Sequence, residues 1–225
     1  MALAAIEEDL DEVLLAQLRT LPIRPGVPLV AVDADEVLVH LADHLVSYLP
    51  RIGFRMELEQ YRLEGSIFPV DSDVPVPFNE CLQLIDQFFE EETINQQAVP
   101  GAPEALARLA ERAQMVVLTN VPPHASEARR RNLAALGMGF PMVQNVGGKG
   151  RALRWMSARA GAPAVFIDDS PAQHESAARR APEVTRIHFL GASYLRRILP
   201  ESPSAHHRVE DWAECEAVVR GVLAL

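Results

Sequence analysis

The chain has 225 residues, of which 48% are hydrophobic and 23% are charged, as is ordinary for a soluble globular protein. Its formal net charge of −10 argues against a broad nucleic-acid-binding surface but leaves room for a local anion site. No hydrophobic run approaches the ~20 residues that span a bilayer, and the N-terminus is too acidic for a signal peptide. We therefore expect a cytoplasmic protein, monomeric or homodimeric, with no membrane and no nucleic-acid polymer as a partner.

Residues 3–19 carry hydrophobic side chains at helical spacing, which predicts an amphipathic helix within an N-terminal segment, 1–26. This helix is expected to pack either on the core or on a partner subunit. The hydrophobic run Leu29–Val32 then predicts a buried parallel strand, and Asp33 and Asp35 follow it. Two acids at the end of a buried strand are costly unless a cation or a reaction requires them.

After Asp35 the spacing of Leu41, Leu45, Tyr48 and Leu49 predicts a helix, and from Ile52 to about Val99 the alternation of strand and helix patterns is lost. The spacing favours several helices, including a short one over 57–64 and a longer one for which Asn79 is the expected N-cap. We interpret 40–99 as a mostly helical cap, inserted into a core made of 27–39 and 100–225.

In the second part of the core, strand patterns again alternate with helix patterns. The predicted strands cover residues 115–118, 142–146, 164–167 and 184–189. Such alternation indicates a mostly parallel sheet with helices on both faces, which is a Rossmann-like three-layer α/β sandwich.

Polar side chains come directly after the predicted strands or in the turns that follow them: Asp33 and Asp35, Thr119 and Asn120, Lys149, and Asp168 and Asp169. Because the carboxyl ends of parallel strands meet at one edge of the sheet, we expect these side chains to share one pocket. Several carboxylates with a hydroxyl and an ammonium favour a hard cation beside a phosphate-like anion, and Mg²⁺ suits such a set. Lys149 is the only lysine in the chain.

From Leu29 to Phe189 the chain resembles the haloacid dehalogenase-like (HAD) superfamily, whose members are mostly phosphohydrolases. The four motifs occur in the family's order, beginning with Asp-Ala-Asp-Glu-Val at Asp33. Glu36 stands there at a position where glycine is common. Thr119, Lys149 and the Asp168–Asp169 doublet match the second, third and fourth motifs, and the helical insertion lies where the family's C1-type cap does.

The resemblance implies a Mg²⁺-dependent phosphomonoesterase that acts on a small phosphorylated metabolite, with nucleotides and sugar phosphates as candidates, through an aspartyl-phosphate intermediate. It makes Asp33 the nucleophile and Asp35 the general acid and base. The remaining implied roles are phosphate binding by Thr119, Asn120 and Lys149, and metal binding by Asp33, Asp35 through its backbone carbonyl, Asp168 and Asp169. Which member of the doublet ligates the metal directly stays open.

Three other functions are compatible with parts of this pattern. A dehalogenase is disfavoured, because those members lack the second acid of the first motif, here Asp35. A signalling receiver domain gathers similar residues, but its acidic pair precedes its lone aspartate and the domain is smaller. A non-catalytic regulatory protein that keeps the fold and binds a metal or phosphate remains the alternative.

Some side chains outside these motifs could also bind a ligand. His40 and His44 stand four residues apart on a predicted helix, which allows a metal pair, but a solvated or substrate-facing pair is favoured. Tyr61, Arg62 and Glu64 of the insertion are candidates for substrate specificity, although ordinary packing explains them equally well.

The other conspicuous side chains are expected to be structural. We expect a solvated helix face for Arg129–Arg131, surface or capping positions for His174, His206 and His207, core positions for Trp155 and Trp212, and buried free thiols of a reducing compartment for Cys81 and Cys215.

Overall fold

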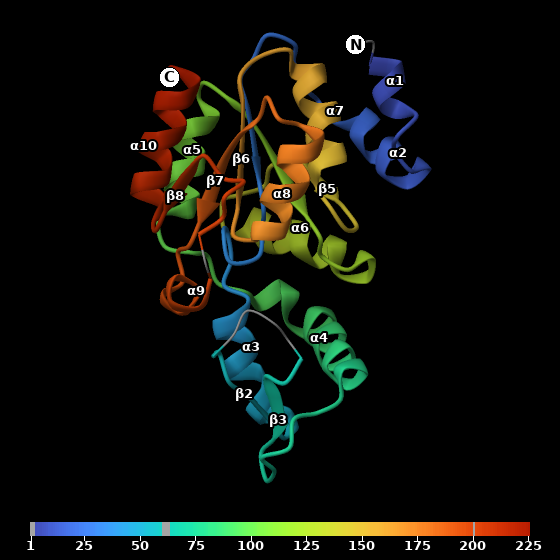
Figure 1. Ribbon diagram of the computed structural model, residues 1–225, viewed down its shortest axis with the longest axis vertical. Helices are drawn as coiled ribbons and strands as arrows, with labels where there is room; N and C mark the ends of the chain where they lie inside the picture. The colour runs from blue at the N-terminus through green and yellow to red at the C-terminus, as the bar shows by residue number, and fades with distance from the viewer. Residues whose placement is uncertain (1–2, 60–63, 200) are drawn as a thin grey trace.

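The computed structural model describes residues 3–59, 64–199 and 201–225 (Figure 1). Its core is a six-stranded sheet in which every neighbouring pair is parallel, in the order β5-β4-β1-β6-β7-β8. The strands are β1 (Leu29–Val32), β4 (Gln114–Thr119), β5 (Met142–Gln144), β6 (Ala164–Asp168), β7 (Thr185–Phe189) and β8 (His207–Val209). The predicted Rossmann-like α/β core is confirmed. Strand β8 was not predicted, because it is short and its first two side chains are exposed.

Helices cover both faces of this sheet (Figure 1). The side chains of β1 alternate between two hydrophobic clusters, since successive strand residues point to opposite faces. One cluster includes α5 (Ala102–Ala110) and α10 (Trp212–Leu223), and the other includes α7 (Gly150–Ala160) and α8 (Pro171–Arg180). Trp155 and Trp212 are both buried, so their predicted core positions are confirmed.

The N-terminal segment is two helices, α1 (Leu3–Glu7) and α2 (Glu12–Thr20), where the sequence predicted one. The chain breaks between them because Asp11 caps α2, accepting a hydrogen bond of 2.8 Å from the backbone N–H of Leu14. The segment packs on the core: Trp155 donates to Glu7 at 3.1 Å, and the Gln17 side chain forms two hydrogen bonds of 2.9 Å with the backbone of Gln144. Gln17 thereby covers part of an edge strand.

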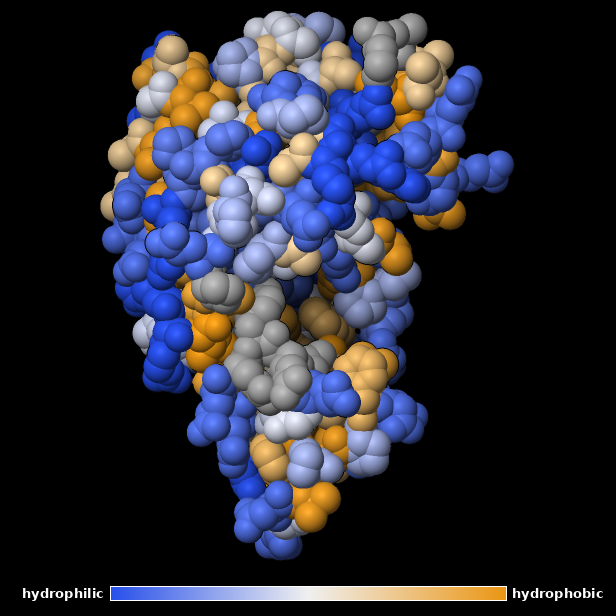
Figure 2. Space-filling model, viewed as in Figure 1, coloured by the Kyte–Doolittle hydropathy of each residue, from blue (hydrophilic) through white to orange (hydrophobic). Residues whose placement is uncertain are grey.

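The described residues between 40 and 99 lie in a separate layer below the core in Figure 1, which we propose as the cap and call by that name. It contains α3 (Ala42–Tyr48) and α4 (Phe78–Glu92), short 3₁₀ turns at Leu49–Ile52 and Thr93–Asn95, and an antiparallel ribbon of β2 (Phe54–Met56) and β3 (Ile67–Pro69). The ribbon was not predicted, because three-residue strands carry too little alternation to detect. Figure 2 shows a hollow where the cap meets the core.

Two details of the cap differ from the sequence prediction. Helix α4 begins at Phe78 with Pro77 at the cap position, so Asn79 lies inside the first turn and is not the N-cap. In the predicted helix over 57–64, residues 57–59 and 64 are not helical, and the remainder lies outside the described residues.

The remaining elements are a 3₁₀ turn at Pro123–Ala125, α6 (Ser126–Ala135) and α9 (Ser193–Ile198). Cys81 and Cys215 are buried and form no disulfide. In the described part of the chain, no helix combines the length and the hydrophobicity needed to cross a membrane.

Candidate active site

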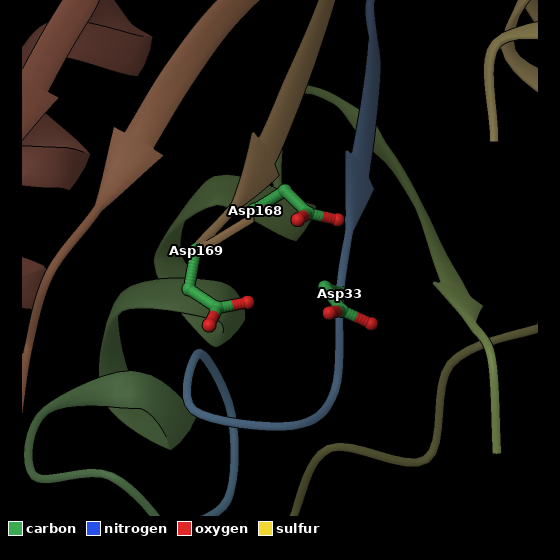
Figure 3. A group of neighbouring side chains, drawn as sticks. All are labelled: Asp33, Asp168 and Asp169. Atoms are coloured by element: carbon green, nitrogen blue, oxygen red, sulfur yellow. The ribbon is translucent and has the colours of Figure 1, made fainter. Parts of the chain in front are cut away.

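Three aspartates converge at the carboxyl edge of the sheet (Figure 3). Asp33 follows β1, Asp168 is the last residue of β6, and Asp169 comes next. The two strands are neighbours, and their register places Val32 beside Ile167, so the residues that follow must meet. One carboxylate oxygen from each aspartate lies within 4.8 Å of the others, and all three residues are buried.

Lys149 joins this group from the start of α7. Its Nζ lies 2.7 Å from Oδ1 of Asp33 and 2.7 Å from Oδ2 of Asp168, and the residue is 1% exposed. The glycines beside it permit this close packing, because a Cβ at Gly150 would overlap the backbone oxygen of Ser176 on α8. The predicted meeting of Lys149 with the strand-end acids is therefore seen in the structure.

The aspartates carry more negative charge than Lys149 can offset. Burial raises the pKa of Asp33 to about 6, although Lys149 opposes the rise. Burial, with Asp168 and Asp33 nearby, raises the pKa of Asp169 well above its usual range. Burial works against the Lys149 ammonium, but Asp168 and Asp33 outweigh it and raise the pKa of Lys149, so it stays charged.

This excess charge and these donor atoms fit a divalent cation. Three carboxylates face one ammonium, and oxygen ligands of this kind are those that Mg²⁺ prefers. Among the residues that the structure describes, Asp33, Asp168 and Asp169 form the only group of three or more metal-binding side chains at such distances. A bound cation would relieve the repulsion that raises the pKa values of these aspartates.

The two members of the doublet have different surroundings. Asp168 is fully buried, with Oδ2 bonded to Lys149 and Oδ1 accepting from the backbone N–H of Ser170 at 2.9 Å. Asp169 instead lines the cavity described below. Of the two residues of the doublet, only Asp169 lines this cavity.

Arg129 of α6 forms an ion pair with Asp35. Nη2 of Arg129 lies 2.5 Å from Oδ1 of Asp35, and the Arg129 side chain is fully buried. The prediction of a solvated face for Arg129–Arg131 is thus wrong at its first residue. The sequence spacing could have indicated that Arg129 is buried, because Ala125, Arg129 and Leu133 lie four residues apart and share one helix face with two hydrophobic side chains. Burial raises the pKa of Asp35, and Arg129 partly offsets that rise.

Thr119 is the last residue of β4, the neighbour of β1, and Asn120 follows it. The Thr119 hydroxyl is buried and accepts from the backbone N–H of Val121 at 3.3 Å. Asn120 donates to the carbonyl of Gly147 at 2.9 Å and accepts from the side chain of Asn145 at 2.8 Å. Asn145 was not expected from the sequence, because it lies inside the predicted strand 142–146; the observed strand β5 ends at Gln144, so Asn145 directly follows it.

Glu36 adopts the left-handed backbone conformation, with φ of 61°. This explains why glycine suits the position, since a side chain there is strained by roughly 1–2 kcal/mol. The Glu36 carboxylate compensates by accepting from the backbone N–H groups of Leu41 and Ala42, at 2.9 and 2.5 Å, before α3. Burial raises the pKa of Glu36 to about 7.

Two histidines support the backbone of the doublet. The Nε2 atoms of His174 and His188 lie 2.9 Å from the carbonyl oxygens of Asp168 and Asp169, respectively. Burial lowers the pKa of His174 to about 3, so the ring is neutral and its Nε2–H donates. The expected surface or capping position is wrong for His174, whereas His206 and His207 are exposed. His188 was not singled out, because it lies inside a hydrophobic strand pattern.

The remaining candidates that the structure describes do not join the site. His44 pairs with Glu92 at 2.8 Å, and Nδ1 of His40 lies 3.9 Å from Asp43, so the two histidines do not face a common ligand. Glu64 is exposed. Tyr61 and Arg62 lie outside the described residues.

A cavity of about 360 Å³ lies over these groups, between the sheet edge and the cap. Its floor, here called the polar floor, consists of Asp33, Asp35, Asn120, Lys149 and Asp169. Thr119 and Asp168 lie behind this floor rather than on it. The site residues expected from the sequence thus lie in or directly beneath one cavity, which is the size of a small-molecule site.

Comparison with known proteins supports the fold but gives no match by sequence: no family model and no curated protein matches the chain. Among solved structures, it is similar to a HAD family hydrolase from Deinococcus radiodurans R1 with bound phosphate and sodium, with 19% identity, a TM-score of 0.58, and coverage of 89% of this chain and 99% of that one.

Two further solved structures show the same likeness. One is a predicted phosphoglycolate phosphatase from Haemophilus somnus 129PT, with 15% identity, a TM-score of 0.59, and coverage of 86% and 98%. The other is CbbY from Rhodobacter sphaeroides in complex with phosphate, with 16% identity, a TM-score of 0.54, and coverage of 84% and 96%. The parallel sheet, the cap and these similarities together show that the chain has the fold of the haloacid dehalogenase-like hydrolases.

Proposed function

We propose that this protein is a Mg²⁺-dependent phosphomonoesterase that acts on a small organic phosphate. The observation that carries the proposal is the buried group of Asp33, Asp168 and Asp169 with Lys149, placed on and beneath the floor of a cavity between the core and the cap. Phosphoryl transfer needs positioning and charge neutralisation above all, and this group offers both. The similar structures from D. radiodurans and R. sphaeroides contain phosphate, which agrees with a phosphate ester as substrate.

Asp33 is proposed as the nucleophile. Its Oδ1 accepts from the backbone N–H of Ala34 at 2.7 Å and from Lys149, whereas Oδ2 has no donor among the described residues. The two bonds fix the carboxylate and leave Oδ2 to attack phosphorus. This attack forms an aspartyl-phosphate and releases the alcohol, and water then cleaves the acyl phosphate.

Asp35 is proposed as the general acid and base. It would protonate the leaving oxygen in the first step and deprotonate the attacking water in the second. Burial, which raises the pKa of Asp35, favours a carboxyl that can carry a proton near neutral pH. Arg129 fixes the direction of this carboxyl, while Thr119 and Asn120 would hold the phosphoryl oxygens and Lys149 would offset their charge.

The side chains of Asp33 and Asp169, with the backbone carbonyl of Asp35, are proposed to hold Mg²⁺. Asp169 is preferred to Asp168 because both oxygens of Asp168 already accept hydrogen bonds from Lys149 and the Ser170 backbone. The cation would neutralise the negative charge of the nucleophile and the phosphate. His174 and His188 hold the backbone of the doublet in place for this role.

The test is phosphate release from 4-nitrophenyl phosphate with Mg²⁺ and with EDTA. Wild-type protein should release phosphate only with the metal, Asp33→Asn should be inactive, and Asp35→Asn should be slower by roughly 10²–10⁴-fold. Asp71→Asn, which changes an exposed aspartate of the cap, is the matched control and should keep full activity. Absence of turnover by wild-type protein would favour the regulatory alternative, and full activity of Asp33→Asn would overturn the assigned nucleophile.

A further inference from the structure

The cavity above the polar floor has walls of a different chemical character. Three elements of the structure supply hydrophobic side chains to it: the start of the cap with Leu41 and Leu45, the rest of the cap with Met56, Leu58 and Ile85, and helix α9 with Tyr194 and Ile198. In Figure 2, hydrophobic side chains are visible in the hollow between core and cap. The organic group attached to the phosphate would extend from the polar floor into the space that these hydrophobic side chains surround.

Two arginines in the described part of the cap, Arg51 and Arg55, pair with acids that lie outside this space. Arg51 forms an ion pair with Glu92, and Arg55 forms ion pairs with Glu57 and Asp73. None of these five residues lines the cavity. Among the residues that the structure describes around the cavity, Lys149 is the only cation, and it is bonded to Asp33 and Asp168 at the floor.

A second anionic group on the substrate would therefore meet no positive partner among these lining residues. It would instead lie near Asp35, Glu36 and Asp169, which are acidic. Ser170 and Gln173 also line the cavity, but the Gln173 side chain is already bonded to the backbone of Lys149 and Gly147. A leaving group rich in hydroxyls would therefore lose its water against the hydrophobic walls and gain few hydrogen bonds in return, which is unfavourable. A hydrophobic leaving group gains from the same burial, by about fourfold in affinity for each methylene.

We infer that the substrate is the phosphate monoester of a hydrophobic, uncharged alcohol or phenol rather than a nucleotide, a sugar phosphate or a phosphorylated acid. This inference rests on the proposed phosphatase function and specifies the substrate class of the same site. The phosphate binds at the polar floor, and the hydrophobic leaving group fills the space between α3, α4 and α9. The cavity volume of about 360 Å³ limits the leaving group to a small aryl or medium alkyl size.

The test compares kcat/KM across n-alkyl phosphates from ethyl to hexyl, with glycerol 3-phosphate as the hydroxylated counterpart of propyl phosphate. The value should rise by about threefold to fourfold for each methylene until the cavity is full. Propyl phosphate should exceed glycerol 3-phosphate by at least tenfold, and phosphoglycolate should be a poorer substrate than ethyl phosphate.

Two variants in α4 distinguish an effect of the cavity wall on substrate preference from a general effect of the substitution on the protein. Ile85→Asn changes a wall residue and should reduce the hexyl-to-ethyl ratio of kcat/KM by about fivefold or more. Leu82→Asn changes an exposed residue of the same helix and should leave that ratio unchanged. Because each ratio is measured within one variant, partial loss of folded protein does not affect it.

The outcomes distinguish the two proposals. A flat alkyl series, or glycerol 3-phosphate hydrolysed as well as propyl phosphate, would overturn the substrate class while leaving the phosphatase function standing. An unchanged hexyl-to-ethyl ratio in Ile85→Asn would overturn the assigned position of the leaving group. If no phosphate ester of any kind were hydrolysed, the phosphatase function itself would fail, and the substrate class with it.

Discussion

Replacing Asp33 with asparagine should abolish turnover and at the same time stabilise the metal-free protein at pH 7. Burial raises the pKa of the Asp33 carboxyl to about 6 in the folded protein, even with Lys149 beside it. In the unfolded chain an aspartate titrates near ~3.9, so the folded state binds the proton more tightly. The stability contributed by this group is therefore present below about pH 4 and is lost as the pH rises toward 6.

The size of the effect follows from that difference in pKa. Ionising Asp33 at pH 7 costs the folded state about 3 kcal/mol relative to the unfolded state. Asparagine stays neutral, and its oxygen can still accept from Ala34 and Lys149. The variant should therefore unfold at a temperature higher by roughly 6–12 °C in EDTA, given about 2–4 °C per kcal/mol for a chain of this size.

The assay is urea and thermal unfolding of wild-type and Asp33→Asn protein at pH 4.5 and pH 7, in EDTA and in Mg²⁺. The advantage of the variant should be largest at pH 7 in EDTA. It should shrink at pH 4.5, where the wild-type carboxyl becomes protonated, and in Mg²⁺, which stabilises the ionised form. A variant less stable than wild type at pH 7 in EDTA would show that the ionised Asp33 carboxylate does not destabilise the folded protein.

Three further substitutions test the contacts around the floor by equilibrium unfolding. Lys149→Met should cost about 3–5 kcal/mol, because it leaves buried carboxylates without their cation, and a loss below about 1 kcal/mol would contradict the geometry. Asp35→Ala should cost a similar amount by leaving the buried Arg129 without its partner, and adding Arg129→Met should restore most of it; additive losses would contradict this coupling. Glu36→Ala should be less stable than Glu36→Gly by about 1 kcal/mol, because both lose the contacts to α3 but only glycine relieves the positive φ, and the reverse order would contradict the strain.

The sequence was most informative where strands end. A buried parallel strand places the residue after it at a fixed edge, so Asp33, Thr119 and Asp168 could be assigned to one place before any coordinates were known. Lys149 could be placed at the same edge, because its glycine-rich turn follows another predicted strand. These predictions succeed because a local strand pattern is enough to locate the residue that follows it, once the strands are parallel neighbours in one sheet.

The supporting groups could not be predicted in the same way, because their roles depend on contacts distant in sequence. Arg129 belongs to a run of three arginines, and only the packing of α6 decides that the first is buried against Asp35, 94 residues earlier. His174 and His188 donate hydrogen bonds to the backbone carbonyls of Asp168 and Asp169. A pattern of side chains in the sequence does not reveal contacts with backbone atoms. The hydrophobic walls of the cavity likewise come from α3, α4 and α9 together, and only the tertiary fold shows that they face one space.

The most direct test of the proposed chemistry is detection of the covalent intermediate. Wild-type protein with Mg²⁺ and an aryl phosphate would be quenched in acid within milliseconds, digested, and analysed by mass spectrometry for a phosphoryl group. If Asp33 is the nucleophile, the peptide containing Asp33 should carry this group, and the same peptide of Asp33→Asn should not. Rapid phosphate release with no phosphorylated Asp33, or with the phosphoryl group on another residue, would contradict this role.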